Sequence, residues 1–228
     1  MFPIILCSVI AMAIIIERFL ALRNSKVISP EDVNLARKMA SEGSVNEQAI
    51  ERLRSGSIIG NVLAAGLSGS SLPRHIMKEN VEEAGRHAVH RMERYLNTLG
   101  TIAAITPLMG LLGTVLGMIT AFSKITQVGV GDPATVAGGI SQALVTTAAG
   151  ISVALVALVF HRYFKGRVDN YVVSMEQQAV KLIELVHQNN QNQIQAAARP
   201  AARQPGNGNL SRAEAAIAAA KRRAGVQA

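Results

Sequence analysis

Three long stretches of this 228-residue chain carry no charged side chain, and they limit what it can fold into more than any other feature. They are residues 1–16, 95–123 and 133–160. A helix needs about 20 predominantly apolar residues to cross the hydrocarbon core of a bilayer. Charged residues make up only 17% of the chain, whereas soluble domains usually carry about 25%. The sequence therefore predicts an all-α membrane protein with three transmembrane helices.

These stretches divide the chain into segments. The expected segments are transmembrane helices at 1–22, 95–123 and 133–162, a helical loop at 23–94, a short loop at 124–132, a helix at 163–195 and a basic, Ala-rich, disordered tail at 196–228. A secretory signal peptide is an alternative for the first segment, but it requires a basic region ahead of the apolar run. The apolar run here begins at residue 1, which favours a transmembrane helix.

The distribution of basic residues predicts the orientation in the membrane. The segment 23–94 contains eleven Lys and Arg, the segment 124–132 contains only Lys124, and residues from 162 onward contain ten. Lys and Arg are enriched in cytoplasmic loops. We therefore expect the long loop and the C-terminus in the cytoplasm, with the N-terminus and the short loop on the outer side.

The long loop has the pattern of helices. Pro30-Glu31-Asp32 is a helix start, because proline favours the first turn and acidic side chains favour the positive end of the helix dipole. A second short helix is expected at 45–53, followed by a stretch at 57–71 that is rich in Gly and Ser but also apolar. After Pro73 we expect a longer helix that leads straight into the second transmembrane segment.

No pattern in this sequence predicts a binding site for a metal ion, a cofactor or nucleic acid. His75, His87 and His90 lie in the same expected helix, but no Cys or Asp completes a ligand set, so a solvated helix face is the favoured interpretation. Cys7 is the only cysteine and lies in an apolar run, where it is expected to pack as a small apolar residue. The net charge of +8 is largely explained by the basic cytoplasmic segments, so it need not signal nucleic-acid binding; membrane lipid is an expected partner and nucleic acid is not.

Small residues recur at steps of three and four in the second and third spans. Such stripes let helices approach closely in membranes. The packing positions are Gly110, Gly113, Gly117, Gly139 and Gly150. Three spans are too few to surround a pore alone, so a homo-oligomer follows. In the second span Pro107 removes the amide that would bond to the Ala103 carbonyl, and a local kink is expected there.

The charge-free stretches of the second and third spans, 95–123 and 133–160, contain polar groups but no Asp, Glu, His, Lys or Arg. The candidate pathway residues are Thr106, Gln142, Thr146 and Thr147. Taken singly, each hydroxyl is more often bonded to its own helix backbone than engaged in function. Because no titratable group is present at membrane depth, any proton that crosses here needs a carboxylate from another chain.

Three segments together resemble the MotA/TolQ/ExbB proton channel family, in particular ExbB and TolQ. The segments are Ile15-Ile16-Glu17-Arg18, Thr106-Pro-Leu-Met-Gly-Leu-Leu-Gly-Thr-Val-Leu-Gly-Met118 and Gly139-Ile-Ser-Gln-Ala-Leu-Val-Thr-Thr-Ala-Ala-Gly150. The resemblance implies a pentameric ring in the bacterial inner membrane around a single-span ExbD/TolR-like partner with a membrane Asp. It also implies that force passes to a TonB- or TolA-like protein in the periplasm.

The resemblance places individual residues as well. Thr147 matches the third-span threonine whose hydroxyl faces the partner Asp, and Pro107 matches the second-span proline. Three positions depart from the family pattern: Gln142 replaces a glutamate, Val156 replaces a proline, and Ile105 stands where those proteins have a threonine, with Thr106 one place on.

Two functions remain open on this sequence, and neither is enzymatic. The first is a subunit of a motor driven by the proton motive force, favoured by Thr147 and the glycine stripes. The second is a structural membrane scaffold that holds a partner without conducting protons, favoured by Gln142. A small-solute transporter fits poorly, because no inverted repeat or polar binding constellation is visible.

Overall fold

The computed structural model describes residues 2–44, 46–128 and 133–198, which form eight α-helices and, within those ranges, no strand. The helices are α1 Phe2–Ala21, α2 Asn24–Val27, α3 Pro30–Glu42, α4 Glu47–Ser55, α5 Ile58–Ser68, α6 Arg74–Glu93, α7 Leu96–Val128 and α8 Pro133–Ala198. The chain divides into two units, residues 1–189 and 190–228, and the description below concerns the first. Residues 129–132 of the expected short loop, and the expected tail from residue 199 onward, lie outside the described residues.

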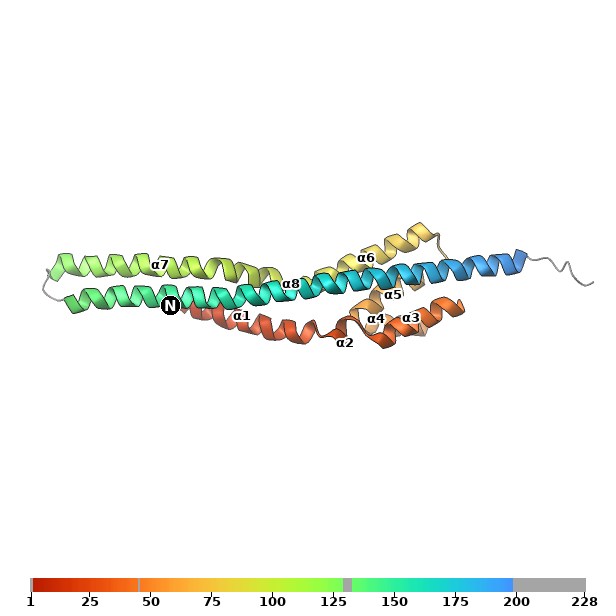
Figure 1. Cartoon of the computed structure of the whole chain (residues 1–228), viewed down its shortest axis with the longest axis horizontal. Coiled ribbons are helices and arrows are strands. Elements are labelled where there is room, and N and C mark those ends of the chain that lie inside the picture. Colours follow the sequence, from red (N-terminus) through yellow and green to blue (C-terminus); the bar gives the residue numbers. More distant parts are fainter. Residues whose placement is uncertain (1, 45, 129–132, 199–228) are drawn as a thin grey trace, which may run out of the picture. The chain divides into compact units, whose positions relative to one another are not determined.

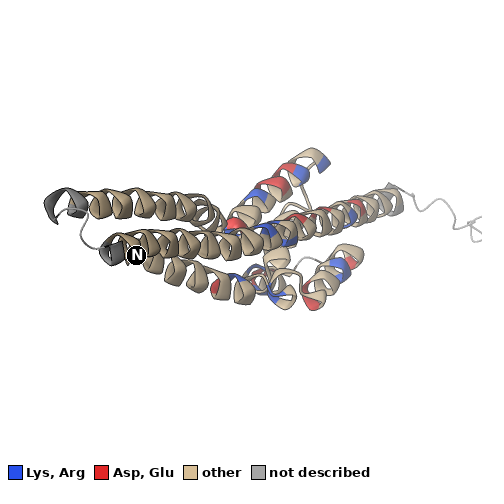
Figure 2. Cartoon of the chain, turned by 60° about the vertical axis from the view of Figure 1, so that its left-hand side comes forward, with Lys and Arg blue, Asp and Glu red and all other residues tan. Residues whose placement is uncertain are grey.

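Three helical stretches are long and apolar enough to cross a membrane, within Phe2–Ala21, Arg74–Ser123 and Val136–Gln195. α1, α7 and the first part of α8 run side by side (Figure 1). Figure 2 shows Lys, Arg, Asp and Glu gathered on the other helices and on the later part of α8. The prediction of an all-helical membrane protein with three long apolar helices is therefore confirmed.

Most large apolar side chains of α7 and of the first part of α8 remain exposed in the single chain. Leu108 and Leu111 on α7 and Leu144 and Leu155 on α8 are each more than half exposed. An apolar surface of this extent needs a cover of lipid or of other protein chains. Within one chain, these helices are covered where α7 meets α8 and where α1 packs against them.

α1 is fastened to α8 where the apolar run of α1 ends. The ring of Phe19 packs edge-on against Phe160 and Phe164, with centroid distances of 5.7 and 5.0 Å. The Tyr171 hydroxyl donates to the Leu22 carbonyl at 2.9 Å and accepts from the Arg167 guanidinium at 2.7 Å. This hydrogen bond with Tyr171 raises the pKa of Arg167 above its ordinary value, against a smaller opposing effect of burial. The C-terminal end of α1 is thus capped by side chains of α8.

The loop between the first two long helices is built around α5. The predicted helix start at Pro30 is confirmed, with Ser29 as the N-cap of α3, and the second predicted helix is α4, two residues later than expected. The Gly- and Ser-rich stretch folds as α5, and seven of its eleven residues are buried. Ser57 caps α5 and donates its hydroxyl to Asp32 Oδ2 at 2.5 Å, which ties α5 to α3.

The prediction of one continuous helix from Pro73 into the second span is wrong at one point. α6 ends at Glu93 and α7 begins at Leu96, because Tyr95 between them has a φ of 63°. A non-glycine residue in this left-handed region ends a helix and leaves its last carbonyl groups without backbone partners.

Arg18 supplies those partners. Its side chain is only 3% exposed, and Nη1 donates to the Met92 carbonyl at 2.9 Å and to the Arg91 carbonyl at 3.5 Å. The other guanidinium nitrogens bind the carboxylate of Glu17 at 2.5 and 2.7 Å, so the buried charge is balanced. One arginine therefore holds the end of α1 against the end of α6.

Arg18→Met is expected to lower the free energy of unfolding by about 2 kcal/mol, because buried carbonyl groups lose their donor while the side chain keeps its length. Thermal melting followed by circular dichroism at 222 nm measures the loss. Arg23→Met removes an equal charge from an exposed side chain five residues further on and is expected to melt like the parent protein. Equal melting of the two variants would contradict the role given to Arg18.

Candidate functional site

The candidate site is the strip where α7 and α8 pack against each other. The contacts pair Thr106 with Gly150, Gly113 with Thr146, and Gly117 with Ala143. Numbers rise on α7 as they fall on α8, so the two helices are antiparallel. All five glycines expected at packing positions lie on this strip, and a Cβ atom at each of them would come within 3.1 Å of an atom of the facing helix.

Backbone approaches backbone most closely at Gly150. A Cβ atom there would lie 2.7 Å from the carbonyl oxygen of Thr106 and 3.1 Å from the Cα of Gly110. At Gly110 a Cβ would lie 3.1 Å from the Cα of Thr147. Real Cβ atoms essentially never come as close as the first of these distances, so the helix separation requires glycine at this point.

The three candidate threonines differ in what their hydroxyls bind. Thr106 is fully buried and donates to the Ile102 carbonyl of its own helix. Thr146 is 6% exposed and donates to the Gln142 carbonyl at 2.9 Å, again within its own helix. Thr147 is half-buried and donates across the interface to the Gly110 carbonyl at 2.9 Å. Thr147 is therefore the candidate threonine whose hydroxyl joins the two helices.

Gln142 is not brought together with Thr147. Five residues correspond to about 140° around an α-helix. The two side chains therefore lie on opposite sides of the strip that meets α7, and Gln142 is exposed in the single chain. Pro107 lies beside Thr106 in α7, which continues through it as one helix. The angle of the expected kink stays a prediction.

The electrostatics of the strip follow from the sequence, which has no ionisable side chain between Leu96 and Ser123 or between Val136 and Phe160. The first ionisable group on α8 beyond the strip is His161, whose Nε2 lies 3.0 Å from where a Cβ of Gly100 would be. Within the described ranges, no three His, Cys, Asp or Glu side chains are grouped to hold a metal ion. Hydroxyl and carbonyl oxygens are thus the chemical groups of this site.

The Thr147 hydroxyl can form further hydrogen bonds only as an acceptor. A hydroxyl carries one hydrogen and two acceptor lone pairs. Its hydrogen is engaged with Gly110, so toward a third group Thr147 can only accept. A protonated carboxylic acid can donate to it, whereas an ionised carboxylate has no hydrogen to give.

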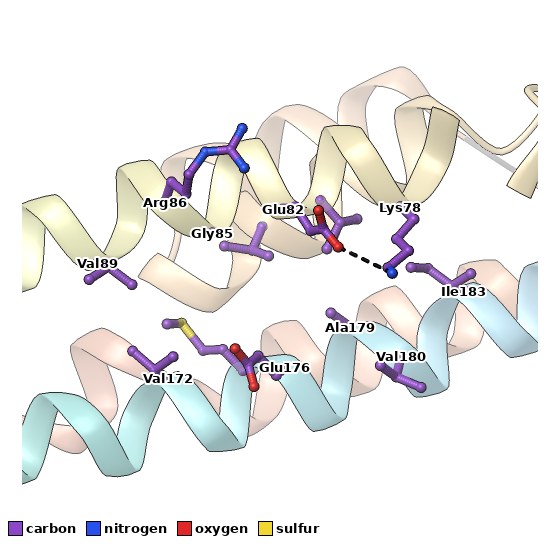
Figure 3. Close-up of a pocket in the computed structure, with 13 residues that line it drawn as sticks. Lys78, Glu82, Gly85, Arg86, Val89, Val172, Glu176, Ala179, Val180 and Ile183 are labelled. Carbon is purple, nitrogen blue, oxygen red and sulfur yellow. Dashed lines mark ion pairs between the residues drawn. The ribbon is translucent and has the colours of Figure 1, made fainter. Parts of the chain in front are cut away.

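A groove of about 590 Å³ lies between α6 and α8, and no pattern in the sequence indicated it (Figure 3). Apolar side chains, among them Val89, Val172 and Ile183, lie along it, and charged ones occupy its edges. Lys78 and Glu82 form an ion pair at 3.4 Å on the α6 side. The groove has the character of a helix-packing surface.

The contact between Arg18 and the end of α6 was also missed. Arg18 follows an apolar run, which by itself indicates only where a membrane segment ends. Its hydrogen-bond acceptor lies 74 positions away, and no local pattern connects the two.

A family model described as the MotA/TolQ/ExbB proton channel family matches residues 54–177. A putative biopolymer transport protein ExbB-like 1 of Synechocystis is 33% identical over 165 residues, which are 71% of this chain and 65% of that protein. A putative ExbB homolog of Methanothermobacter thermautotrophicus is 29% identical over 153 residues, 67% of this chain and 54% of the relative. The Tol-Pal system protein TolQ of Pseudomonas aeruginosa is 37% identical over 93 residues, 39% of this chain and 40% of TolQ. The matched part of the chain spans between about half and two thirds of the first two relatives.

Proposed function

Because the chain belongs to the MotA/TolQ/ExbB proton channel family, we propose that it is an ExbB/TolQ-like subunit of a motor driven by the proton motive force. In this proposal identical copies form a ring, a pentamer, in the bacterial inner membrane around a single-span ExbD/TolR-like partner. The motor energises a process of the cell envelope or of transport, with a TonB- or TolA-like protein as a further partner. The chain acts as an energy-transducing subunit and not as an enzyme.

The proposed orientation places the N-terminus in the periplasm and residues 23–94, together with the chain after residue 162, in the cytoplasm. The excess of Lys and Arg in these segments supports it. The helical extensions that we propose to lie in the cytoplasm are α2 to α6 and the part of α8 beyond the apolar run.

The single observation that carries the proposal is the hydroxyl of Thr147, held at the edge of an interface that lacks every titratable group. The exposed apolar faces of α7 and α8 need a cover, and further copies of the chain and the partner supply it in this proposal. The partner also supplies the carboxylate, because intramembrane proton transfer requires an ionisable side chain.

Thr147 can distinguish the two states of that carboxylate. It accepts a hydrogen bond from the protonated acid while it keeps its own bond to Gly110. The ionised acid receives no hydrogen from it unless the bond to Gly110 breaks. Thr147 therefore favours the neutral acid at this position, and loss of the proton weakens the contact. Thr106 and Thr146, buried beside it, line the same strip as positioning groups, and Gln142 is proposed to face a different neighbour.

The second candidate function is a scaffold that holds a partner without conducting protons. Gln142, in place of the glutamate expected from the resemblance, favours it, because glutamine keeps the hydrogen bonds but cannot carry a proton as a carboxylate does.

One experiment separates the two functions. The chain is co-expressed with a single-span protein that carries an Asp in its membrane segment, and the complex is purified through a tag on that partner. Native mass spectrometry counts the subunits, and the complex is then placed in liposomes that contain a pH-sensitive dye. We expect five copies of this chain per complex and a proton flux that disappears with Asp→Asn in the partner. A stable complex with no flux above empty liposomes would support the scaffold, and failure to co-purify would overturn both.

A further inference from the structure

A hollow of about 670 Å³ opens where α1 ends, and residues from six helices or their caps surround it, with Gly56 as the contribution of the α4 cap. Ala21 comes from α1, Lys26 from α2, Asp32 from α3, Ile58 from α5 and Arg91 from α6. Arg94, just after α6, completes its basic side, and the serines at positions 25, 29 and 57 add hydroxyl groups. The site described above does not use this hollow.

The hollow is strongly basic. Lys26, Arg91 and Arg94 are exposed, and none of them forms an ion pair with a carboxylate of the described residues. Asp32 is its only acidic residue, and its Oδ2 already accepts from the Ser57 amide at 2.9 Å and from the Ser57 hydroxyl. Three cations face one engaged carboxylate, so the hollow attracts an anion.

The basic residues converge through the fold and not through the sequence. Lys26 lies 65 positions before Arg91, and the two meet here because Arg18 holds the end of α1 against the end of α6. An excess of basic residues on the cytoplasmic side of a membrane requires only that these residues lie in cytoplasmic loops, and not that they lie close together. Convergence on one hollow is an additional feature, and it points to a ligand with a compact negative charge.

The position of the hollow relative to the membrane indicates the kind of ligand. Ala21 is the last residue of the apolar α1, and Leu96, two positions after Arg94, is the first residue of α7. Tyr95, whose ring lies 4.8 Å from the Arg94 guanidinium, is a residue type enriched at the membrane–water interface. The hollow therefore lies at the level of the lipid headgroups, and Leu20, which precedes Ala21 in α1, is 62% exposed and offers an apolar surface to an acyl chain.

We propose that this hollow binds the phosphate group of an anionic phospholipid from the adjoining leaflet. Lys26, Arg91 and Arg94 contact the phosphate oxygens, the hydroxyls of Ser25 and Ser29 donate to the headgroup, and the acyl chains lie along α1. Bound in this way, the lipid joins α1, α2 and α6 at the same junction that Arg18 holds from inside. The proposal requires a membrane-spanning chain and does not depend on proton conduction.

Native mass spectrometry of the detergent-purified oligomer tests the proposal after addition of dioleoyl phosphatidylglycerol or dioleoyl phosphatidylcholine. The variant is Lys26→Gln with Arg91→Gln. The matched control is Lys38→Gln with Arg54→Gln, which removes two exposed cations of the same loop that pair with surface glutamates. We expect the parent and the control to bind phosphatidylglycerol in preference to phosphatidylcholine. The variant is expected to bind phosphatidylglycerol about thirtyfold more weakly, the loss associated with two cations near an anionic surface.

A soluble competitor separates lipid from free phosphate. Glycerophosphoglycerol, which has the headgroup without acyl chains, is expected to leave the bound lipid in place at equal concentration. Displacement by it, or by inorganic phosphate, would overturn the lipid assignment in favour of a soluble anion. Equal lipid retention by the variant and the control would overturn the site itself. If the double variant fails to assemble, Arg91→Gln alone is compared with Arg54→Gln alone, with an expected loss of about fivefold.

Discussion

Thr147→Val in the complex with its single-span partner is expected to remove about nine tenths of the proton flux while the subunit composition stays the same. Valine has the shape of threonine but cannot accept a hydrogen bond from a protonated carboxylic acid. The net value of such a bond is about 1–1.5 kcal/mol, which corresponds to roughly a tenfold change in occupancy. The bond between Thr147 and Gly110 is lost as well, but single interhelical hydrogen bonds in membranes contribute only about 0.6 kcal/mol.

Two further variants make this result specific. Thr147→Ser keeps the hydroxyl and is expected to keep most of the flux. Thr101→Val removes the hydroxyl of an exposed threonine on α7, which donates to the Asn97 carbonyl of its own helix at 2.9 Å, and is expected to have no effect. The measurement is dye-reported proton uptake by liposomes that contain equal amounts of complex. A Thr147→Val complex with the flux of the parent would remove the main support for the motor.

Gly150→Leu is expected to prevent the pairing of α7 and α8, so that no folded protein is recovered from the membrane. The Cβ atom alone would lie 2.7 Å from the backbone oxygen of Thr106, and a backbone atom cannot turn aside as a side chain does. Gly150→Ala adds only that atom, and we expect it to lower the free energy of unfolding by about 1–3 kcal/mol, the usual range for overpacking. Fluorescence-detected size-exclusion chromatography of tagged protein measures the recovery.

Gly138→Leu is the matched control for this prediction. Gly138 lies in the same apolar part of α8, but within the described surroundings a Cβ there would meet no atom within 4 Å. We expect near-normal recovery, because glycine is the poorer helix former by about 1 kcal/mol. Recovery of folded Gly150→Leu at the level of Gly138→Leu would contradict the close approach of the two helices.

The sequence was sufficient for the three long apolar helices, because the absence of charge over a bilayer's width is a property of each segment alone. It was not sufficient for the break at Tyr95. Nothing local to Tyr95 disfavours a continued helix, and its left-handed conformation is held by the contacts of Arg18 with the carbonyl groups of Arg91 and Met92. The stretch that folds as α5 was described only as rich in Gly and Ser but also apolar, and no helix was assigned to it; its Gly60 and Gly66 lie where neighbouring atoms leave little or no space for a side chain.

For the candidate site, the sequence indicated residues but not their partners. The steps of three and four placed Gly110, Gly113 and Gly117 on one face, and the resemblance singled out Thr147. The donor role of Thr147 toward Gly110 depends on the register of α7 against α8, which no pattern within either helix determines. Helix geometry alone separates the side chains of Gln142 and Thr147. It does not determine which of the two side chains lies next to α7.

Val156 gives α8 a mechanical property that a proline at that position would remove. Sharp bends in helices need a proline or another interruption of the backbone hydrogen bonds, and α8 has no proline after its first residue. From the strip that packs against α7 to Asn189, α8 can therefore rotate as one rigid helix, with little torsional deformation along its length. A turn imposed on it at membrane depth would reach the contacts with Phe19 and Leu22 at nearly its full angle.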